Sequence, residues 1–421
     1  MNVKFRLTLM NFMQFFIWGS WLITIGVYWF QNKQWSGAEF GVIFSTMGIS
    51  AIFMPALAGI LSDRFINAEK LYGTMHILGS IVLFCLPMVE DPKTFFWVIL
   101  LNMIFYMPTL SLSITVAYSA LKRHQKDVVR DYPPIRIWGT IGFIAALWTV
   151  SLSGNEASSN QFYIASAVSL VLGIYSFTLP KCPPLANKVD SKSFVDALGL
   201  RAFALFKQRK FAVFFLFSMF LGAALQLTNA YGDTFLHDFK NVPEYKDLLA
   251  VKYPAIIMSI SQISETLFIL AIPFFLRKFG IRYVMLFSML AWVLRFGLFA
   301  FADPAGGLWM IILSCIIYGM AFDFFNISGS LFVETQIDEK IRGSAQGLFM
   351  MMVNGFGALF GSFTSGIVIE KFFTQADQTK DWPGIWITFA SYTLVLAIIF
   401  PLIFKYKHNK AETAAIEAMS H

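Results

Sequence analysis

Four charged residues lie within long apolar stretches of the sequence, namely Arg136, Glu265, Arg295 and Asp323. A charge at the centre of a membrane span costs roughly 2.5–3.5 kcal/mol on the insertion scale. Such side chains are therefore expected to be paired, hydrated or turned toward a cavity. A carboxylate in this setting can also take up and release a proton. Asp323 and Glu265 are therefore candidates for proton coupling.

Asp323 lies in an aromatic stretch in which Tyr318 and Phe322 are four residues apart. Aromatic rings beside hydrogen-bonding groups suit a planar base attached to a sugar, and rings stack on bases at roughly 1–3 kcal/mol per base in nucleic-acid binders. The alternative for Asp323 is a structural salt bridge between helices, for example to Arg295. The alternative for the rings is ordinary packing. For Arg295 we expect a structural or gating ion pair.

Two pairs of polar residues share a spacing of three, which places each pair on one helix face. One pair is Gln262 and Glu265, and the other is Gln226 and Asn229 in the preceding span. A carboxylate beside an amide offers several acceptors and donors for a vicinal diol. The alternatives are polar helix–helix contacts and, for Asn229, hydration at the outer end of its span.

Arg136, Thr140 and Phe143 follow one another at helical spacing and form one stripe. They come directly after Pro133 and Pro134. The alternative for Arg136 is an interfacial arginine whose side chain reaches back to the cytoplasmic surface.

Composition determines the class of protein that must hold these residues. The chain has 421 residues, of which 57% are hydrophobic, 17% aromatic and 14% charged, and its mean hydropathy is +0.64. A soluble domain carries about 25% charged residues. Apolar blocks of about 20 residues predict an all-α polytopic protein in a lipid bilayer. The net charge of +7 is spread over short loops, which argues against nucleic acid as a partner.

Hydropathy predicts twelve spans. They fall at roughly 6–30, 39–62, 71–89, 95–121, 135–153, 161–179, 211–232, 254–276, 283–302, 307–333, 342–368 and 384–404. Most of the 32 Lys and Arg residues fall in the loops on one side, so both termini are expected in the cytoplasm. The first apolar run is too long for a signal peptide and is interpreted as a retained helix.

The longest polar connection, 181–210, divides the chain into 1–180 and 211–404, followed by a cytoplasmic tail, 405–421. Two motifs echo each other across this division. The stretch 59–65 resembles 273–280, and 135–143 resembles 341–349. Repeats at half the chain length predict two pseudo-symmetric six-helix bundles with a substrate site near the membrane midplane between them.

Motifs for other chemistry are missing from the sequence. The three cysteines form no metal or redox motif, and there is no phosphate-binding loop, zinc-protease motif or nucleophile elbow. We therefore expect no enzyme, no metal and no cofactor.

Longer motifs resemble known families. Gly59-x-Leu61-x-Asp63-Arg64-Phe65, ahead of Lys70, resembles the loop motif of the major facilitator superfamily, although no Asp precedes Arg277 in the second half. The stretches 132–143, 257–268 and 318–329 resemble the bacterial nucleoside:proton symporter family, and the resemblance covers essentially the whole chain.

This resemblance implies a monomeric twelve-helix carrier in the bacterial cytoplasmic (inner) membrane. It would import purine and pyrimidine nucleosides, such as uridine, cytidine and adenosine, together with protons, by rocker-switch alternating access. The coupling ion would be the proton, and no cofactor would be needed.

The resemblance also implies a set of site residues. Substrate would be bound by Arg136, Thr140 and Phe143 in the first half and by Gln226, Asn229, Gln262, Glu265, Tyr318, Phe322 and Asp323 in the second. Asp323 and Glu265 would couple the proton, and Asp63 with Arg64 would latch one conformation. Two other classes stay open, namely a sugar or oligosaccharide carrier on the same scaffold and a membrane-embedded enzyme or sensor.

Overall fold

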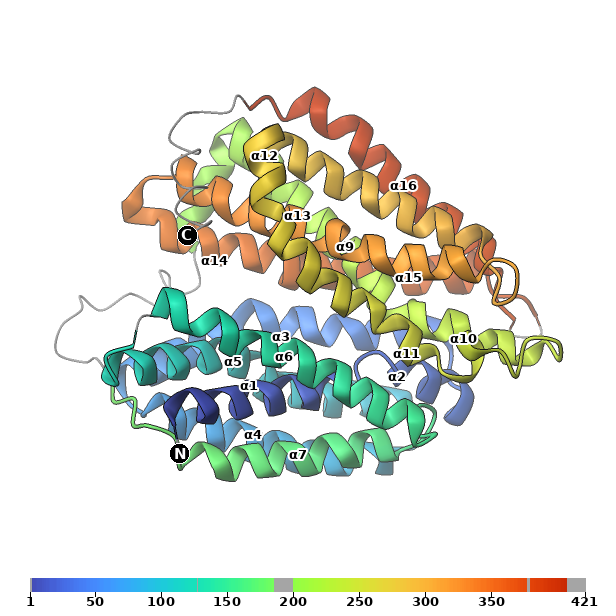
Figure 1. Cartoon of the computed structure of the whole chain (residues 1–421). Coiled ribbons are helices and arrows are strands. Elements are labelled where there is room, and N and C mark those ends of the chain that lie inside the picture. The colour runs from blue at the N-terminus through green and yellow to red at the C-terminus, as the bar shows by residue number, and fades with distance from the viewer. Residues whose placement is uncertain (1, 127, 185–199, 377–378, 407–421) are drawn as a thin grey trace. The chain divides into compact units, whose positions relative to one another are not determined.

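A computed structural model describes residues 2–126, 128–184, 200–376 and 379–406. It divides into two units, Met1–Leu198 and Gly199–His421, each of which is described here by itself. Residues 185–199, which are half of the predicted linker 181–210, and most of the tail 405–421 lie outside the described residues. Within the described ranges the chain is helical, apart from one isolated bridge between Thr374 and Lys380 (Figure 1).

The first unit contains six membrane-crossing helices. They are α1 (Val3–Gly19), α3 (Gly37–Arg64), α4 (Ala68–Cys85), α5 (Pro92–Arg123), α6 (Val128–Leu152) and α7 (Asn160–Ser176), with the short α2 (Ile25–Val27) and the π-helix η1 (Tyr28–Asn32) after α1. Side-chain caps fix some of the helix starts. Asp91 caps α5, whose first residue is Pro92, and its carboxylate accepts hydrogen bonds from the amide and the hydroxyl of Thr94. These hydrogen bonds lower the pKa of Asp91.

The second unit begins with the 3₁₀ helix η3 (Leu200–Lys207). Its long helices are α9 (Arg209–Asp238), α12 (Ile260–Phe301), α13 (Leu308–Gln336), α14 (Glu339–Met350) continuing through η5 (Met351–Gly357) into α15 (Ala358–Phe372), and α16 (Trp382–Ile403), with the short α10 (Leu249–Lys252) and α11 (Pro254–Met258) ahead of α12.

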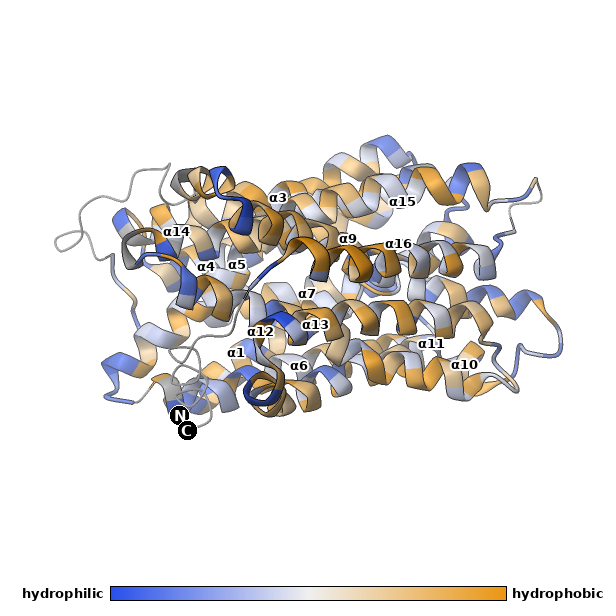
Figure 2. Ribbon diagram, turned by 90° about the horizontal axis from the view of Figure 1, so that it is seen from above, coloured by the Kyte–Doolittle hydropathy of each residue, from blue (hydrophilic) through white to orange (hydrophobic). Residues whose placement is uncertain are grey.

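The described part of the chain contains twelve membrane crossings, six in each unit. In the described part of the chain nine segments meet a strict length and hydropathy criterion for a span. One of them, Pro254–Phe301, is 48 residues long and makes two crossings, because Gly280 interrupts it with a φ of 76°. The other two crossings, α1 and α7, are only slightly shorter, at 17 residues each. Figure 2 shows apolar residues along the helices and polar residues gathered at their ends.

Two predicted spans differ from the observed helices. The first was expected to run unbroken over 6–30, but α1 ends at Gly19, and turns separate it from α2 and η1. The fifth was expected to begin near 135, but α6 begins at Val128 and passes through two prolines. Membrane helices tolerate proline because neighbouring groups can satisfy the freed carbonyls.

The same packing scheme occurs in both units. In the first unit α1 packs on α6, α3 on α5 and α4 on α7, and in the second α9 packs on α15, α12 on α13 and α12 on α16. The first half of α12 meets α13 through Ser264, and its second half meets α16 through Arg282. In order of crossing, both units therefore pair the first helix with the fifth, the second with the fourth and the third with the sixth. This repetition agrees with the duplication indicated by the sequence.

Glycines permit the closest of these approaches. A Cβ at Gly142 of α6 would overlap the Phe12 carbonyl oxygen of α1, and a Cβ at Gly222 of α9 would overlap the Val353 carbonyl oxygen. The first helix and the fifth therefore meet backbone to backbone in each unit, as small residues allow in membranes.

We expect Gly142→Ala to destabilise the protein by about 1–3 kcal/mol, because the added methyl group must displace backbone. The measurement is thermal unfolding in one detergent. The matched control is Gly297→Ala on α12, where a Cβ would meet nothing within 4 Å and the better helix propensity of alanine applies. Equal unfolding temperatures for the two variants would contradict the prediction.

Candidate functional site

The site of interest in the second unit forms where α12 lies directly against α13. A Cβ at Gly319 would overlap the Ser264 carbonyl and the Glu265 amide nitrogen, so only glycine fits there. The Ser264 hydroxyl donates to the Ile316 carbonyl across the same crossing. This close approach brings Glu265 beside the turn of α13 that carries Tyr318.

Tyr318 is the centre of the cluster and is 5% exposed. Its ring stacks on Phe322 with centroids 5.9 Å apart and an interplanar angle of 11°, and Trp292 meets it edge-on at 6.0 Å. The carboxylates of Glu265 and Asp323 both act electrostatically on its hydroxyl group. The structure therefore brings together four of the predicted residues, and Asp323 is buried among them at 4% exposure.

Arg295 completes this cluster, but not through the ion pair that was expected. The residue is fully buried, and its guanidinium lies over the rings of Tyr318 (4.7 Å) and Phe299 (5.1 Å). Nη1 donates to the Ser314 carbonyl at 2.6 Å and Nε to the Thr228 hydroxyl at 3.4 Å. The expectation of an ion pair is wrong for the described residues, because aromatic faces and a carbonyl take the place of a carboxylate.

Three amide side chains add hydrogen-bonding capacity nearby on α9 and α12. The side-chain oxygens of Gln226 and Gln262 are buried, and neither accepts a hydrogen bond from the described residues. Gln226 is 6% exposed, whereas Asn229, one turn further along α9, is half-buried. Buried acceptors of this kind can receive hydroxyl or N–H donors from a bound molecule.

In the first unit, Arg136 lies in the third turn of α6 with its guanidinium 4.1 Å from the centre of the Phe15 ring of α1. Its charge also acts on Tyr106 of α5. The half-buried Arg136 therefore contacts neighbouring helices and keeps part of its surface exposed.

The remaining predicted residues of the first unit are not gathered into one cluster. Thr140 is half-buried, while Phe143 is 8% exposed and its carbonyl lies against Gly19. Arg64 is exposed at the end of α3, and the side chain of Asp63 lies outside the described residues.

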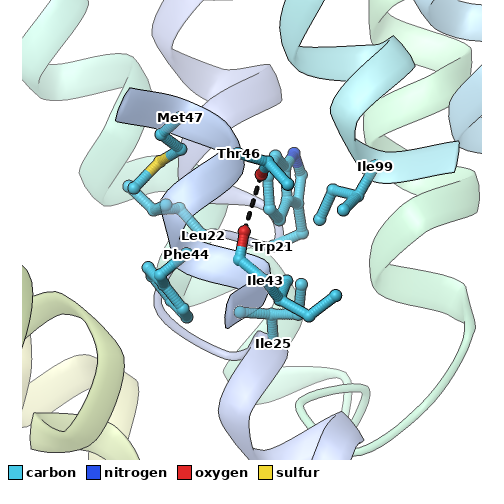
Figure 3. A pocket seen from close by; sticks show the side chains of 8 residues that line it. All are labelled: Trp21, Leu22, Ile25, Ile43, Phe44, Thr46, Met47 and Ile99. Atoms are coloured by element: carbon cyan, nitrogen blue, oxygen red, sulfur yellow. Dashed lines mark hydrogen bonds between the residues drawn. The ribbon is translucent and has the colours of Figure 1, made fainter. Parts of the chain in front are cut away.

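A small pocket in the first unit has a different character. It is lined by Trp21, Leu22, Ile25, Ile43, Phe44, Thr46, Met47 and Ile99 (Figure 3). Its hydroxyl group, on Thr46, already donates to the Ile43 carbonyl at 2.6 Å. The pocket is therefore an apolar gap with little capacity to recognise a polar solute.

Comparison with known proteins identifies the family. A family model described as "Nucleoside H+ symporter" matches residues 1–409. The chain belongs to the nucleoside H+ symporter family.

Relatives with high identity agree with this membership. The chain is 50% identical over 422 residues to the nucleoside permease NupG of Escherichia coli, covering 100% of both, and 52% identical over 410 residues to the xanthosine permease of E. coli, covering 97% of both. A crystal structure of the D323A mutant of the nucleoside transporter NupG matches with a TM-score of 0.93, 51% identity and coverage of 96% of this chain and 100% of that chain. These likenesses support the major facilitator fold of this family member.

Sequence reasoning missed a second polar cluster, which lies in the first unit. Gln14 of α1 accepts hydrogen bonds at its side-chain oxygen from Tyr72 (2.6 Å) and from Nε2 of His76 (2.8 Å), and it donates to Thr109 at 2.9 Å. The His76 ring therefore carries its proton on Nε2, since Gln14 Oε1 can only accept. A polar residue in each of several apolar spans was the available signal, but their pairing depends on tertiary packing.

Proposed function

We propose that this chain is a nucleoside importer that moves purine and pyrimidine nucleosides together with protons by alternating access. Membership of the nucleoside H+ symporter family supports the transport of nucleosides with protons. We place the protein in the bacterial cytoplasmic membrane as a monomer with both termini in the cytoplasm, and assign it no enzymatic activity and no cofactor.

The cluster around Tyr318 is the observation that carries this proposal. It combines a stacked aromatic pair, two carboxylates and nearby amide oxygens that accept no hydrogen bond from the described residues. The base would pack on Phe322, while Glu265, Gln226, Asn229 and Gln262 would bind ribose hydroxyls and base edges.

For the first unit, we propose that Arg136 and Thr140 contribute to substrate binding and that Phe143 supplies an aromatic wall. Asp63 and Arg64 would stabilise one conformation through ion pairs on the cytoplasmic side. The domains 1–180 and 211–404 would be the bodies that move during transport.

Proton coupling would run through Asp323, with Glu265 as its electrostatic neighbour. A proton that crosses ~180 mV releases roughly 4 kcal/mol, at about 2.3 kcal/mol per charge per 100 mV. At about 1.4 kcal/mol per tenfold, this supports accumulation on the order of a thousandfold. No other energy source is required.

The first prediction from the proposed function concerns Asp323→Asn. We expect labelled uridine uptake, in cells lacking their own carriers, to be strong for wild type, to collapse with an uncoupler, and to fall at least tenfold in the variant, because the amide cannot carry the proton. The matched control is Asp247→Asn in an exposed loop, which should transport like wild type.

Each alternative outcome has a distinct meaning. Uptake that resists the uncoupler would indicate a facilitator. Uptake of sugar with none of uridine would favour a sugar carrier. Wild-type rates in Asp323→Asn would remove Asp323 from the coupling mechanism.

The second prediction concerns the amide oxygens that lack donors. Gln226→Met and Gln262→Met should each raise the KM for uridine about fivefold, the equivalent of one lost hydrogen bond of about 1 kcal/mol. If Gln262 binds a ribose hydroxyl, Gln262→Met will lose the wild-type preference for uridine over 2′-deoxyuridine, whereas Gln226→Met will keep it. The exposed Gln375→Met is the control, and an unchanged KM in both buried variants would refute the assignment.

A further inference from the structure

Arg295 has no carboxylate within ion-pair distance among the described residues, although it is fully buried. Its Nη2 makes no hydrogen bond there either. A guanidinium stays charged in proteins, and burying a charge without a partner is costly. A residue that carries this cost invites a functional explanation.

The first consequence of its position is mechanical. Arg295 lies on the second half of α12, donates to Thr228 of α9 and to the Ser314 carbonyl of α13, and receives at its own carbonyl a hydrogen bond from the Ser314 hydroxyl at 3.0 Å. These three helices carry every candidate site residue of the second unit. Arg295 therefore joins the elements that position the site.

The second consequence is electrostatic. Tyr318 lies under the Arg295 guanidinium on one side and within the influence of Glu265 and Asp323 on the other. Cys315 of α13 is the other titratable group that faces Arg295. From α9 the facing group is the uncharged Thr228, and α16 presents Trp386 against Phe299. Tyr318 is thus the group on which the Arg295 guanidinium and both carboxylates act.

We propose that Arg295 is the positioning residue and counter-charge of the proton-coupling pair. It holds Tyr318 in place and keeps one of the two carboxylates ionised, so that the pair binds a single proton at a time. When that proton binds, the group of Glu265, Asp323 and Arg295 goes from one net negative charge to none. This inference rests on the proposed function, since it assigns a role in proton-coupled transport.

The test is the pH dependence of uridine uptake in Arg295→Met and Arg295→Lys, measured with the full-length protein in proteoliposomes. Without the cation, the carboxylates bind protons more readily, so proton loading persists to higher pH. The external pH of half-maximal uptake should rise by about one unit in Arg295→Met, as expected for the loss of a nearby unit charge. Arg295→Lys should keep the wild-type midpoint but raise the KM for uridine, because an ammonium cannot match the planar guanidinium on the ring.

The control is Arg282→Met. Arg282 lies on the same helix and also donates to a carbonyl, that of Pro401 at 2.6 Å, but it does not contact the Tyr318 cluster. The external pH of half-maximal uptake in Arg282→Met should equal that of the wild type. Measurable uptake in Arg295→Met with an unshifted midpoint would overturn the inference.

A milder variant tests the positioning role even if the arginine variants fail to fold. Ser314→Ala keeps the charge and removes only the hydroxyl donor to the Arg295 carbonyl, so the KM should rise with no change in midpoint. An unchanged KM would overturn the positioning role. Wild type without uncoupler-sensitive uridine uptake would instead refute the proposed function, so the two failures are distinguishable.

Discussion

An ionised side chain in the hydrocarbon layer must be offset by its neighbours, and the arrangement of this protein follows from that constraint. Within the described residues, neither intramembrane arginine is offset by a carboxylate. Arg136 lies on the face of Phe15, and Arg295 lies on the faces of Tyr318 and Phe299. In both units, therefore, aromatic faces stabilise a buried or half-buried cation.

The two units share their helix pairing but use buried polar groups differently. In the first unit, Gln14 joins Tyr72, His76 and Thr109 in a network in which its side-chain oxygen and nitrogen are both bonded. In the second, buried side-chain oxygens such as that of Gln226 accept no hydrogen bond from the described residues. A satisfied network stabilises one arrangement, whereas unsatisfied acceptors are suited to a ligand. Unsatisfied buried acceptors also occur in the first unit, as at Asn11 Oδ1, so the difference between the units lies in the network around Gln14.

The sequence predicted the helical class and the twelve crossings, and it placed Tyr318 and Phe322 on one helix face near Asp323, because hydropathy and helical spacing are local properties. It failed where tertiary contacts decide. The partners of Arg295 come from three helices, and no spacing rule relates them. The break after Gly19 falls inside an apolar run that hydropathy treats as one continuous span.

The same cost of buried charge explains how such a site can couple two solutes. In the proposed mechanism the two ionised acids and Arg295 together carry one net negative charge, and enclosing a net charge away from water is unfavourable. A proton removes the net charge, and a nucleoside supplies hydroxyl donors to the acceptors that remain, such as the oxygens of Gln226 and Gln262. In the function proposed, each solute thus lowers the cost of closing the site around the other, and coupling follows from desolvation without a separate trigger.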